Sequence, residues 1–302
     1  MGMTEPLSAP GPDAGGLVPP VWLLIAVALC LPAWVWGVWR IMVRLDAGEE
    51  LPVRLPLPDG RAYPASRIPM PFGLLLFGAM FLTTVLIVTV YLQMAEHGLL
   101  PWRDKAAGGM FSPVMFAVQV VPSLLGLMVV IWFGRGVAGS IGLRLGSVWR
   151  AVKVGVAGLA FVLPLCVAGL ILTTLVFWVL HLPTEQHPLL EELLKPENHT
   201  TRILVLSLVQ AAVLAALAEE FMYRGVLMMS LLKYVSPGWA IAVSSGLWAI
   251  VHLQGEPQAV GALFLLGLAL GYMAYRTRSL LAPVLAHGLF NALMILGRYY
   301  GS

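Results

Sequence analysis

Charged side chains are scarce in this sequence. Asp, Glu, Lys and Arg make up 11% of the 302 residues and hydrophobic residues make up 59%, whereas ordinary globular proteins carry about 25% charged residues. So few charges cannot cover a water-facing surface, which excludes a soluble globular domain. The net charge of +3 is small and spread over short loops, so no nucleic acid is expected as a partner. Cysteine is also nearly absent: Cys30 and Cys166 both lie in apolar runs, which argues against a disulfide scaffold.

The few ionisable residues separate uncharged runs, most of them long enough to span a bilayer, which takes about 20 apolar residues. These runs cover residues 14–39, 68–95, 106–134, 154–184, 203–218, 234–255, 257–275 and 279–297. We therefore predict an all-α fold, a polytopic transmembrane bundle of about eight helices. The fifth run stops at Glu219, but no strong helix breaker precedes Pro237, so we expect the fifth helix to continue to Lys233.

The chain divides into three predicted parts. Residues 1–17 form a Pro- and Gly-rich tail that we expect to be disordered, residues 18–200 hold four transmembrane helices with their loops, and residues 201–298 hold the helices with the polar groups. Thirteen of the 18 Lys and Arg residues lie in or beside the loops that follow odd-numbered helices. Because cytoplasmic loops are enriched in these residues, we expect both termini outside. Arg outnumbers Lys fourteen to four, which is typical of a GC-rich genome and indicates an integral protein of a bacterial cell membrane.

Two common protease signatures are missing. No histidine is followed by Glu, so there is no HExxH zinc motif, and all four aspartates lie outside the spanning helices, so no aspartyl dyad can form. Ionisable groups inside a bilayer are costly and mark functional sites. The ionisable residues within predicted helices gather in the last third of the chain, at Glu219, Glu220, Arg224, His252 and His287, and the polar Asn291 lies one turn after His287.

Helix geometry predicts how these residues meet. Residues four apart share a helix face, so Glu220 can pair with Arg224, and His287 lies beside Asn291. A carboxylate and an imidazole that share one water form a general base, and a second imidazole with a carboxamide supplies N–H donors for an oxyanion. The set therefore predicts hydrolysis of an amide bond within the membrane.

The motifs resemble those of the CPBP intramembrane proteases (CAAX proteases and bacteriocin-processing enzymes, also called Abi) and are similar to the Ras-converting type II CAAX endopeptidases. The likeness covers about residues 203–296 and rests on the glutamate pair followed by Arg224, an aromatic residue one turn before His252, and His287 one turn before Asn291. It implies that residues 201–298 are the catalytic helices and that the substrate is a membrane-associated peptide or protein, of prenylated CAAX type or a small bacterial peptide.

The resemblance also implies roles for single residues. Glu219 and His252 would activate the hydrolytic water, His287 and Asn291 would stabilise the oxyanion, and Glu220 with Arg224 would support the cavity. Such proteases are often described as metalloendopeptidases, yet glutamate-dependent, metal-free catalysis suits the motifs better, so we expect no cofactor. If zinc is bound, Glu219, His252 and His287 are its candidate ligands, as a two-His, one-carboxylate set.

One alternative comes from another functional class. A non-catalytic membrane protein, such as an immunity or transport factor, could bind a peptide or an ion in the same polar cavity. Transporters usually show two related halves, whereas the polar groups here are confined to one end of the chain, which favours the enzyme. Two further expectations are that the cavity opens toward the cytoplasm and that Gly261, Gly267 and Gly271 allow close helix packing.

Overall fold

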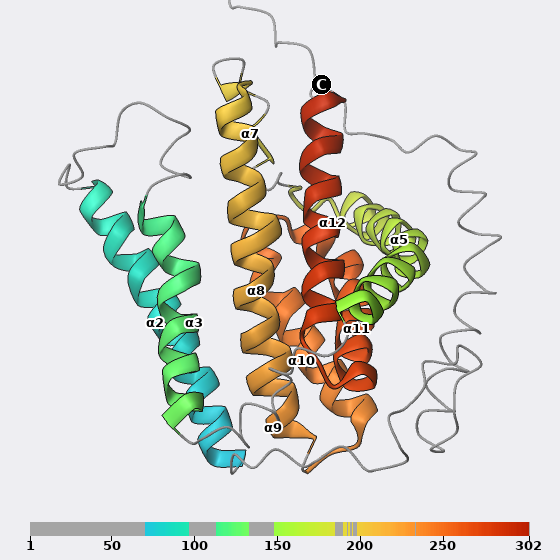
Figure 1. Ribbon diagram of the computed structural model, residues 1–302. Coiled ribbons are helices and arrows are strands. Elements are labelled where there is room, and N and C mark those ends of the chain that lie inside the picture. Colours follow the sequence, from blue (N-terminus) through green and yellow to red (C-terminus); the bar gives the residue numbers. More distant parts are fainter. Residues whose placement is uncertain are drawn as a thin grey trace, which may run out of the picture.

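The computed structural model describes residues 70–96, 113–132, 148–184, 190, 191, 193, 195, 198–232 and 234–301. Within these residues the chain forms helices and no strand (Figure 1), which confirms the predicted all-α fold. The predicted tail, residues 1–17, and the predicted first span, residues 14–39, lie outside the described residues. The boundaries of the three predicted parts stay a prediction.

The helices follow the apolar runs of the sequence. Their bounds are α2 Met70–Glu96, α3 Pro113–Trp132, α5 Val148–Val179, α7 Thr201–Ser207, η3 Leu208–Ala215, α8 Ala216–Glu219, η4 Glu220–Met228, α9 Met229–Leu231, α10 Pro237–Val251, η5 His252–Gln254, η6 Pro257–Ala259, α11 Val260–Thr277 and α12 Leu281–Tyr300. Five segments of the described chain are long and apolar enough to cross a membrane: Gly73–Val90, Val148–Val179, Thr201–Leu231, Pro257–Thr277 and Leu281–Tyr300. Phe116–Trp132 and Pro237–Val251 are shorter apolar helices.

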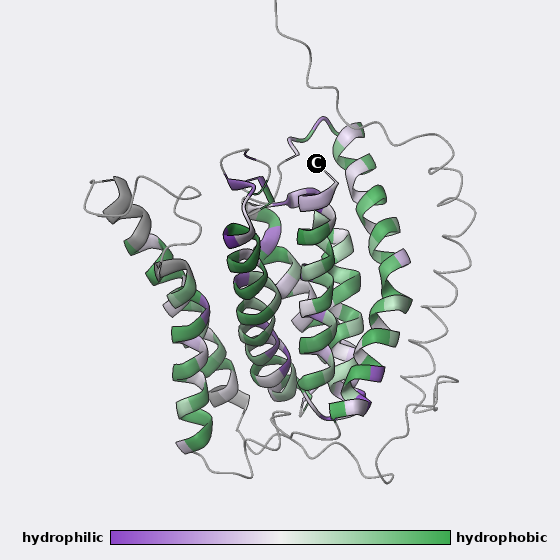
Figure 2. Ribbon diagram, turned by 45° about the horizontal axis from the view of Figure 1, so that its top comes forward, coloured by the Kyte–Doolittle hydropathy of each residue, from purple (hydrophilic) through white to green (hydrophobic). Residues whose placement is uncertain are grey.

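The outer surface of the bundle is apolar. Leu75 is 70% exposed, Trp132 88% and Trp239 68%, and Figure 2 shows hydrophobic residues along most of each helix. Soluble proteins rarely expose apolar surface on this scale. The helices therefore face lipid, and the protein is an integral membrane protein.

The fifth predicted helix continues through the two glutamates. Residues Thr201–Leu231 form one long helix, which confirms the predicted extension as far as Leu231, whereas Lys233 is not described. The helix widens into π-helical turns over Leu208–Ala215 and Glu220–Met228, with the short α-helical segment Ala216–Glu219 between them. Such turns are rare and occur often at functional sites.

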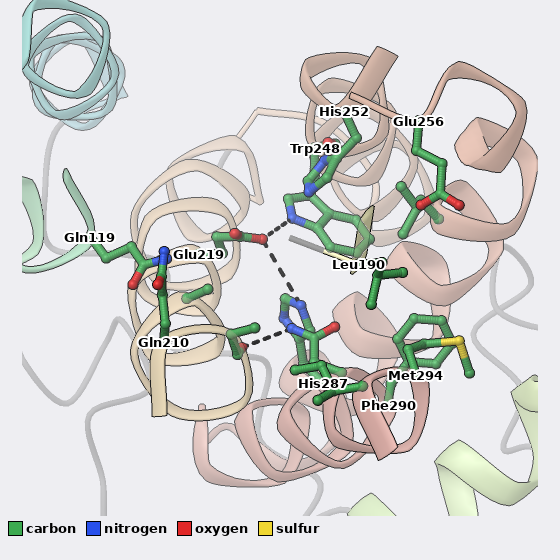
Figure 3. Close-up of a pocket in the computed structure, with 15 residues that line it drawn as sticks. Gln119, Leu190, Gln210, Glu219, Trp248, His252, Glu256, His287, Phe290 and Met294 are labelled. Carbon is green, nitrogen blue, oxygen red and sulfur yellow. Dashed lines mark hydrogen bonds and ion pairs between the residues drawn. The ribbon is translucent and has the colours of Figure 1, made fainter. Parts of the chain in front are cut away.

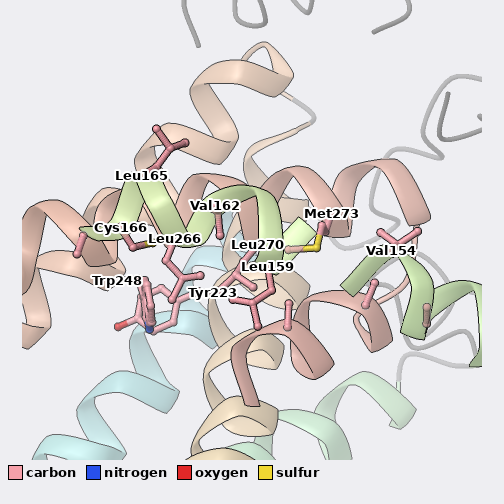
Figure 4. Close-up of a cluster of buried hydrophobic side chains, with 14 of the residues drawn as sticks. Val154, Leu159, Val162, Leu165, Cys166, Tyr223, Trp248, Leu266, Leu270 and Met273 are labelled. Atoms are coloured by element: carbon pink, nitrogen blue, oxygen red, sulfur yellow. The ribbon is translucent and has the colours of Figure 1, made fainter. Parts of the chain in front are cut away.

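The long helix stands between two groups of helices. α2 and α3 lie side by side on one flank, while α10, α11, α12 and the tilted α5 form the other (Figure 1). Figure 4 shows α5 packing into this second group, where Leu159 and Val162 meet Leu266 and Leu270. Trp248 belongs to the same apolar cluster, so the hydrophobic core adjoins the polar residues and fixes their positions.

Close helix approaches depend on glycine at several positions. A Cβ on Gly267 would lie 2.9 Å from the Cβ of Ser245, and a Cβ on Gly288 would clash with the backbone oxygen of Ala212. Gly261 and Gly271 meet similarly close neighbours, at 2.6 Å from Thr173 Cγ2 and 2.9 Å from Ile241 Cγ2 respectively. The predicted packing role of the α11 glycines is confirmed, and Gly288 does the same for α12 against η3.

Candidate active site

The two adjacent glutamates of the long helix occupy different environments. Successive residues are about 100° apart around an α-helix, so their side chains diverge. The Glu219 side chain is 26% exposed, whereas that of Glu220 is fully buried. The sequence pattern Glu-Glu therefore places one carboxylate at a cavity and the other in the protein interior.

Glu220 and Arg224 together connect three helices. Arg224 Nη1 donates to Glu220 Oε1 over 2.9 Å, which confirms the predicted pair, and Arg224 Nη2 donates to the backbone oxygen of Gly267 over 3.2 Å. The same Oε1 lies 3.0 Å from Nδ1 of His287 on α12. All three side chains are buried, so this network is shielded from water and ties α11 and α12 to the long helix.

Glu219 is held by an indole and faces an imidazole. Trp248 Nε1 donates to Glu219 Oε2 over 2.5 Å, and the same oxygen lies 4.0 Å from Nε2 of His287. The Trp248 ring also meets the rings of His252 and His287 edge to face, at centroid distances of 5.1 and 5.2 Å. Of the two histidines, the one within 4.0 Å of the Glu219 carboxylate is thus His287. The resemblance instead implies that Glu219 acts together with His252.

The remaining two predicted residues reach the same cavity. His252 caps the C-terminal end of α10, and its Nδ1 lies 2.7 Å from the backbone oxygen of Trp248. Asn291 Nδ2 donates to the backbone oxygen of Ala211 over 2.8 Å. Each bond uses one ring nitrogen or one N–H, so His252 Nε2 and the second N–H of Asn291 are left for other partners.

A cavity of about 200 Å³ brings these groups together (Figure 3). Glu219, His252, His287 and Asn291 all line it, while Glu220 and Arg224 lie behind its wall. The other lining residues are Gln119, Leu190, Gln210, Ala211, Ala215, Trp248, Glu256, Leu263, Phe290, Met294 and Ile295.

The cavity extends toward one end of the bundle. Gln210 precedes Glu219 on the long helix, and Met294 follows His287 on α12, so the cavity extends toward the end where α12 finishes. The cavity therefore opens on the same side of the membrane as the C-terminus. A C-terminus outside the cell and a cavity open toward the cytoplasm cannot both be correct. The orientation of the termini stays a prediction.

Four polar lining residues were not predicted from the sequence: Gln119, Gln210, Trp248 and Glu256. Trp248 was read only as the aromatic residue of a motif, although its N–H contacts Glu219. Gln210 precedes Glu219 by nine residues, which is about 2.5 turns of an α-helix and predicts opposite faces. The π-helical turns over Leu208–Ala215 hold more residues per turn and so reduce the angle between the two side chains, and both line the cavity. Glu256 lies beyond the end of α10, and only its position four residues after His252 hinted at a shared site.

Glu256 is a carboxyl group at the edge of the cavity, between η5 and η6. Burial raises the pKa of Glu256 above its ordinary value of 4.5, while His252 and Arg298 nearby lower it in part. A carboxyl in this setting retains its proton to a higher pH than an exposed one.

Hydrogen-bond partners assign the imidazole tautomers. The backbone oxygen of Trp248 can only accept, so His252 donates through Nδ1–H; the Glu220 carboxylate likewise accepts from Nδ1–H of His287. In the neutral rings, both Nε2 atoms are then free to accept a proton. The cavity thus contains a carboxylate and two imidazoles that present proton-accepting atoms.

The candidate zinc ligands have the right chemistry but not the right arrangement. Histidines that bind metal usually donate their second N–H to a carboxylate or carbonyl, as His287 and His252 do here. However, among the described residues no three His, Cys, Asp or Glu side chains are grouped so that they could hold a metal ion. Glu219 Oε2 instead receives the Trp248 N–H. The observed positions do not fit a three-ligand site.

These features define a class of protein: a membrane helix bundle in which a carboxylate, two imidazoles and a carboxamide line one polar cavity. Residues 200–293 match the family model for the type II CAAX prenyl endopeptidase Rce1-like proteins. The match covers about a third of the chain; it confirms the resemblance to the CPBP intramembrane proteases and supports a CAAX-type protease in general. No curated protein and no solved structure matches the chain.

Proposed function

We propose that this protein is an intramembrane endopeptidase that hydrolyses a peptide bond in a small membrane-associated peptide or protein, with prenylated CAAX-type peptides as the first candidates. The observation that carries the proposal is the approach of Glu219 Oε2 to His287 Nε2 at 4.0 Å, on the wall of a polar cavity. Two acceptors at this separation can each receive one hydrogen bond from a single water. The oxygen of that water keeps its lone pairs for attack on a carbonyl carbon.

The chemical step needs no group beyond those in the cavity. As the water oxygen bonds to the carbonyl carbon, Glu219 or His287 takes its proton, and the C=O electron pair moves onto the oxygen. The second N–H of Asn291 can stabilise that oxyanion. Collapse of the intermediate breaks the C–N bond, and the same proton passes to the departing amine. Glu220 fixes the His287 tautomer throughout, and the Trp248 N–H keeps the Glu219 carboxylate turned toward the cavity.

The direct test is Glu219→Gln, which retains size and removes the base. In protein reconstituted into lipid with a prenylated CAAX-type peptide, we expect hydrolysis to fall by about 10²–10⁴, the usual contribution of a general base. The exposed Glu191 supplies the matched control, because Glu191→Gln removes a carboxylate outside the cavity and should cleave normally. Unchanged hydrolysis by Glu219→Gln would overturn the proposal and favour the alternative, a binding protein for a peptide or an ion.

Metal dependence is tested separately. Because the described donors do not converge on a three-ligand site, we propose catalysis without zinc. Activity should then survive dialysis against a strong chelator, and elemental analysis of the purified protein should find less than one zinc per chain. Loss of activity that zinc alone restores would contradict this part of the proposal.

A further inference from the structure

Two glutamine carboxamides line the cavity without a role in the chemistry proposed above. Gln119 comes from α3 and Gln210 from η3, so they face each other across the contact between the α2–α3 pair and the long helix. Figure 3 shows their side-chain ends next to one another, on the side of Glu219 away from Glu256. Gln210 is 6% exposed. Within the described part of the chain, the side-chain oxygen of each glutamine is buried and accepts no hydrogen bond.

Unpaired carboxamide oxygens are unfavourable inside a membrane protein, since hydrocarbon offers them no donor. The pair is uncharged, so it supplies no charge to balance an ionic ligand. A carboxamide offers one acceptor and two N–H donors, which complement the C=O and N–H of a peptide main chain. The chemistry of the two side chains therefore suits an extended peptide rather than an ion or a lipid headgroup.

The position of the pair sets its distance from the reacting bond. Gln210 precedes Glu219 by nine residues, at most about 13.5 Å along the helix. An extended chain advances about 3.3 Å per residue, so it covers that distance in about four residues. Because Gln210 and Glu219 line the same cavity, one extended segment can contact the glutamines and still present a peptide bond to Glu219 and His287.

We propose that Gln119 and Gln210 form a subsite that binds the main chain of an extended peptide substrate within about four residues of the scissile bond. This inference rests on the proposed function for the identity of the substrate. The subsite contacts main-chain amides, which every peptide carries, so it can hold peptides of different sequence. It lies where α3 meets the long helix, which gives the α2–α3 pair a part in substrate binding.

The test measures peptide binding apart from hydrolysis. The probe is a fluorescent, farnesylated CAAX-type peptide, and its affinity is measured by anisotropy on full-length Glu219→Gln protein in nanodiscs. Gln119→Met and Gln210→Met keep side-chain length and remove the polar atoms. We expect each to weaken binding about tenfold, as expected for one lost hydrogen bond of ordinary strength. A peptide N-methylated at the contacted amide should bind the unsubstituted site weakly and should lose little more when the glutamines are replaced.

Matched controls lie beside each glutamine. Ser123, one turn after Gln119 on α3, bonds the Gln119 backbone oxygen, and Val209 is exposed next to Gln210. Ser123→Ala and Val209→Leu should leave the affinity unchanged. Equal binding by the Gln→Met variants, or no binding of the probe at all, overturns the subsite. A third outcome separates the two proposals: the probe binds in a way that depends on the glutamines, but the protein with Glu219 intact does not cleave it. That result supports the subsite and overturns only the proposed hydrolysis.

Discussion

His287 and Glu220 lie 67 positions apart in the chain, and the Nδ1 atom of the imidazole is 3.0 Å from the carboxylate oxygen. Glu220 is completely buried and also holds Arg224. One carboxylate therefore neutralises a buried cation and sets which ring nitrogen of His287 faces the cavity. Structural support and the chemistry of the site depend on the same atom.

The Glu220–Arg224 pair should be more sensitive to single than to double substitution. Removing one member of a buried ion pair leaves an uncompensated charge, so Glu220→Leu or Arg224→Met should each cost about 3–5 kcal/mol of unfolding free energy. The double variant removes both charges and should regain much of that stability, as thermal unfolding in detergent would measure. It should not regain hydrolysis, because Nδ1 of His287 has lost its acceptor. Recovery of full activity by the double variant would show that Glu220 acts only through Arg224.

Trp248→Phe should lower activity and also cost some stability, because Trp248 is 1% exposed and the smaller ring leaves space in the core. The change removes the N–H that donates to Glu219 Oε2 and keeps an aromatic ring in the core. A hydrogen bond to a charged group contributes about 1.5–3 kcal/mol, so kcat should fall by roughly tenfold or more. Trp239→Phe on the same helix is the control, since Trp239 is exposed on the outer surface. If both variants cleave equally well, the indole N–H does not position Glu219.

Gly288 should tolerate no side chain. A Cβ at this position would clash with the backbone oxygen of Ala212, whereas a Cβ on Gly297 of the same helix meets nothing within 4 Å. Gly288→Ala should push α12 away from η3, displacing the adjacent His287 and lowering both the melting temperature and kcat. Gly297→Ala should be neutral or raise stability by about 1 kcal/mol, since alanine favours a helix over glycine. Similar melting temperatures for the two variants would contradict the close α12–η3 contact.

Glu256 should make stability depend on pH. Its pKa is raised above the ordinary value of 4.5, mainly by burial, so the folded protein binds this proton more tightly than the unfolded chain does. Stability from this group is therefore greatest below pH 4.5 and falls as the pH rises through the raised pKa. Glu256→Gln should remove that decline, and melting temperatures between about pH 4 and about pH 8 would show it. Glu191→Gln should retain the pH dependence of the unsubstituted protein.

The side of the membrane on which the cavity opens can be read from thiol labelling. Met294 lines the cavity near the C-terminal end of α12. If the termini lie outside, as the distribution of Lys and Arg predicts, Met294→Cys in a chain without Cys30 and Cys166 should react with a membrane-impermeant reagent on intact cells. A cysteine at Tyr234, exposed in the turn at the opposite end, should react only after permeabilisation. The reverse pattern would place the cavity in the cytoplasm and show that the predicted orientation is wrong.

The fold was largely predictable because lipid imposes a simple rule on sequence. A run of about 20 apolar residues must form a helix to satisfy its backbone, and the described helices follow those runs. The extension of the long helix past Glu220 was also predictable, since Pro237 was the first strong breaker. The tilt of α5 and the two π-helical stretches were not, because they arise from packing between segments distant in the chain.

Much of the site could be predicted, but not its contacts. Spacing of four residues predicted the pairing of Glu220 with Arg224, and the motifs predicted that Glu219, His252, His287 and Asn291 would share a cavity. Spacing carries no information about contacts between helices. The approach of Glu219 to His287 and the bond from Trp248 to Glu219 depend on how α10 and α12 pack against the long helix.

The widened turns make the long helix sensitive to its residue count as well as to its residue types. Each residue added or removed in an α-helix rotates everything beyond it by about 100°. A single alanine inserted between Gln210 and Glu219 would therefore turn one polar side chain away from the other, although no functional residue had changed. In this segment, an insertion or deletion of one harmless residue should be more damaging than most substitutions.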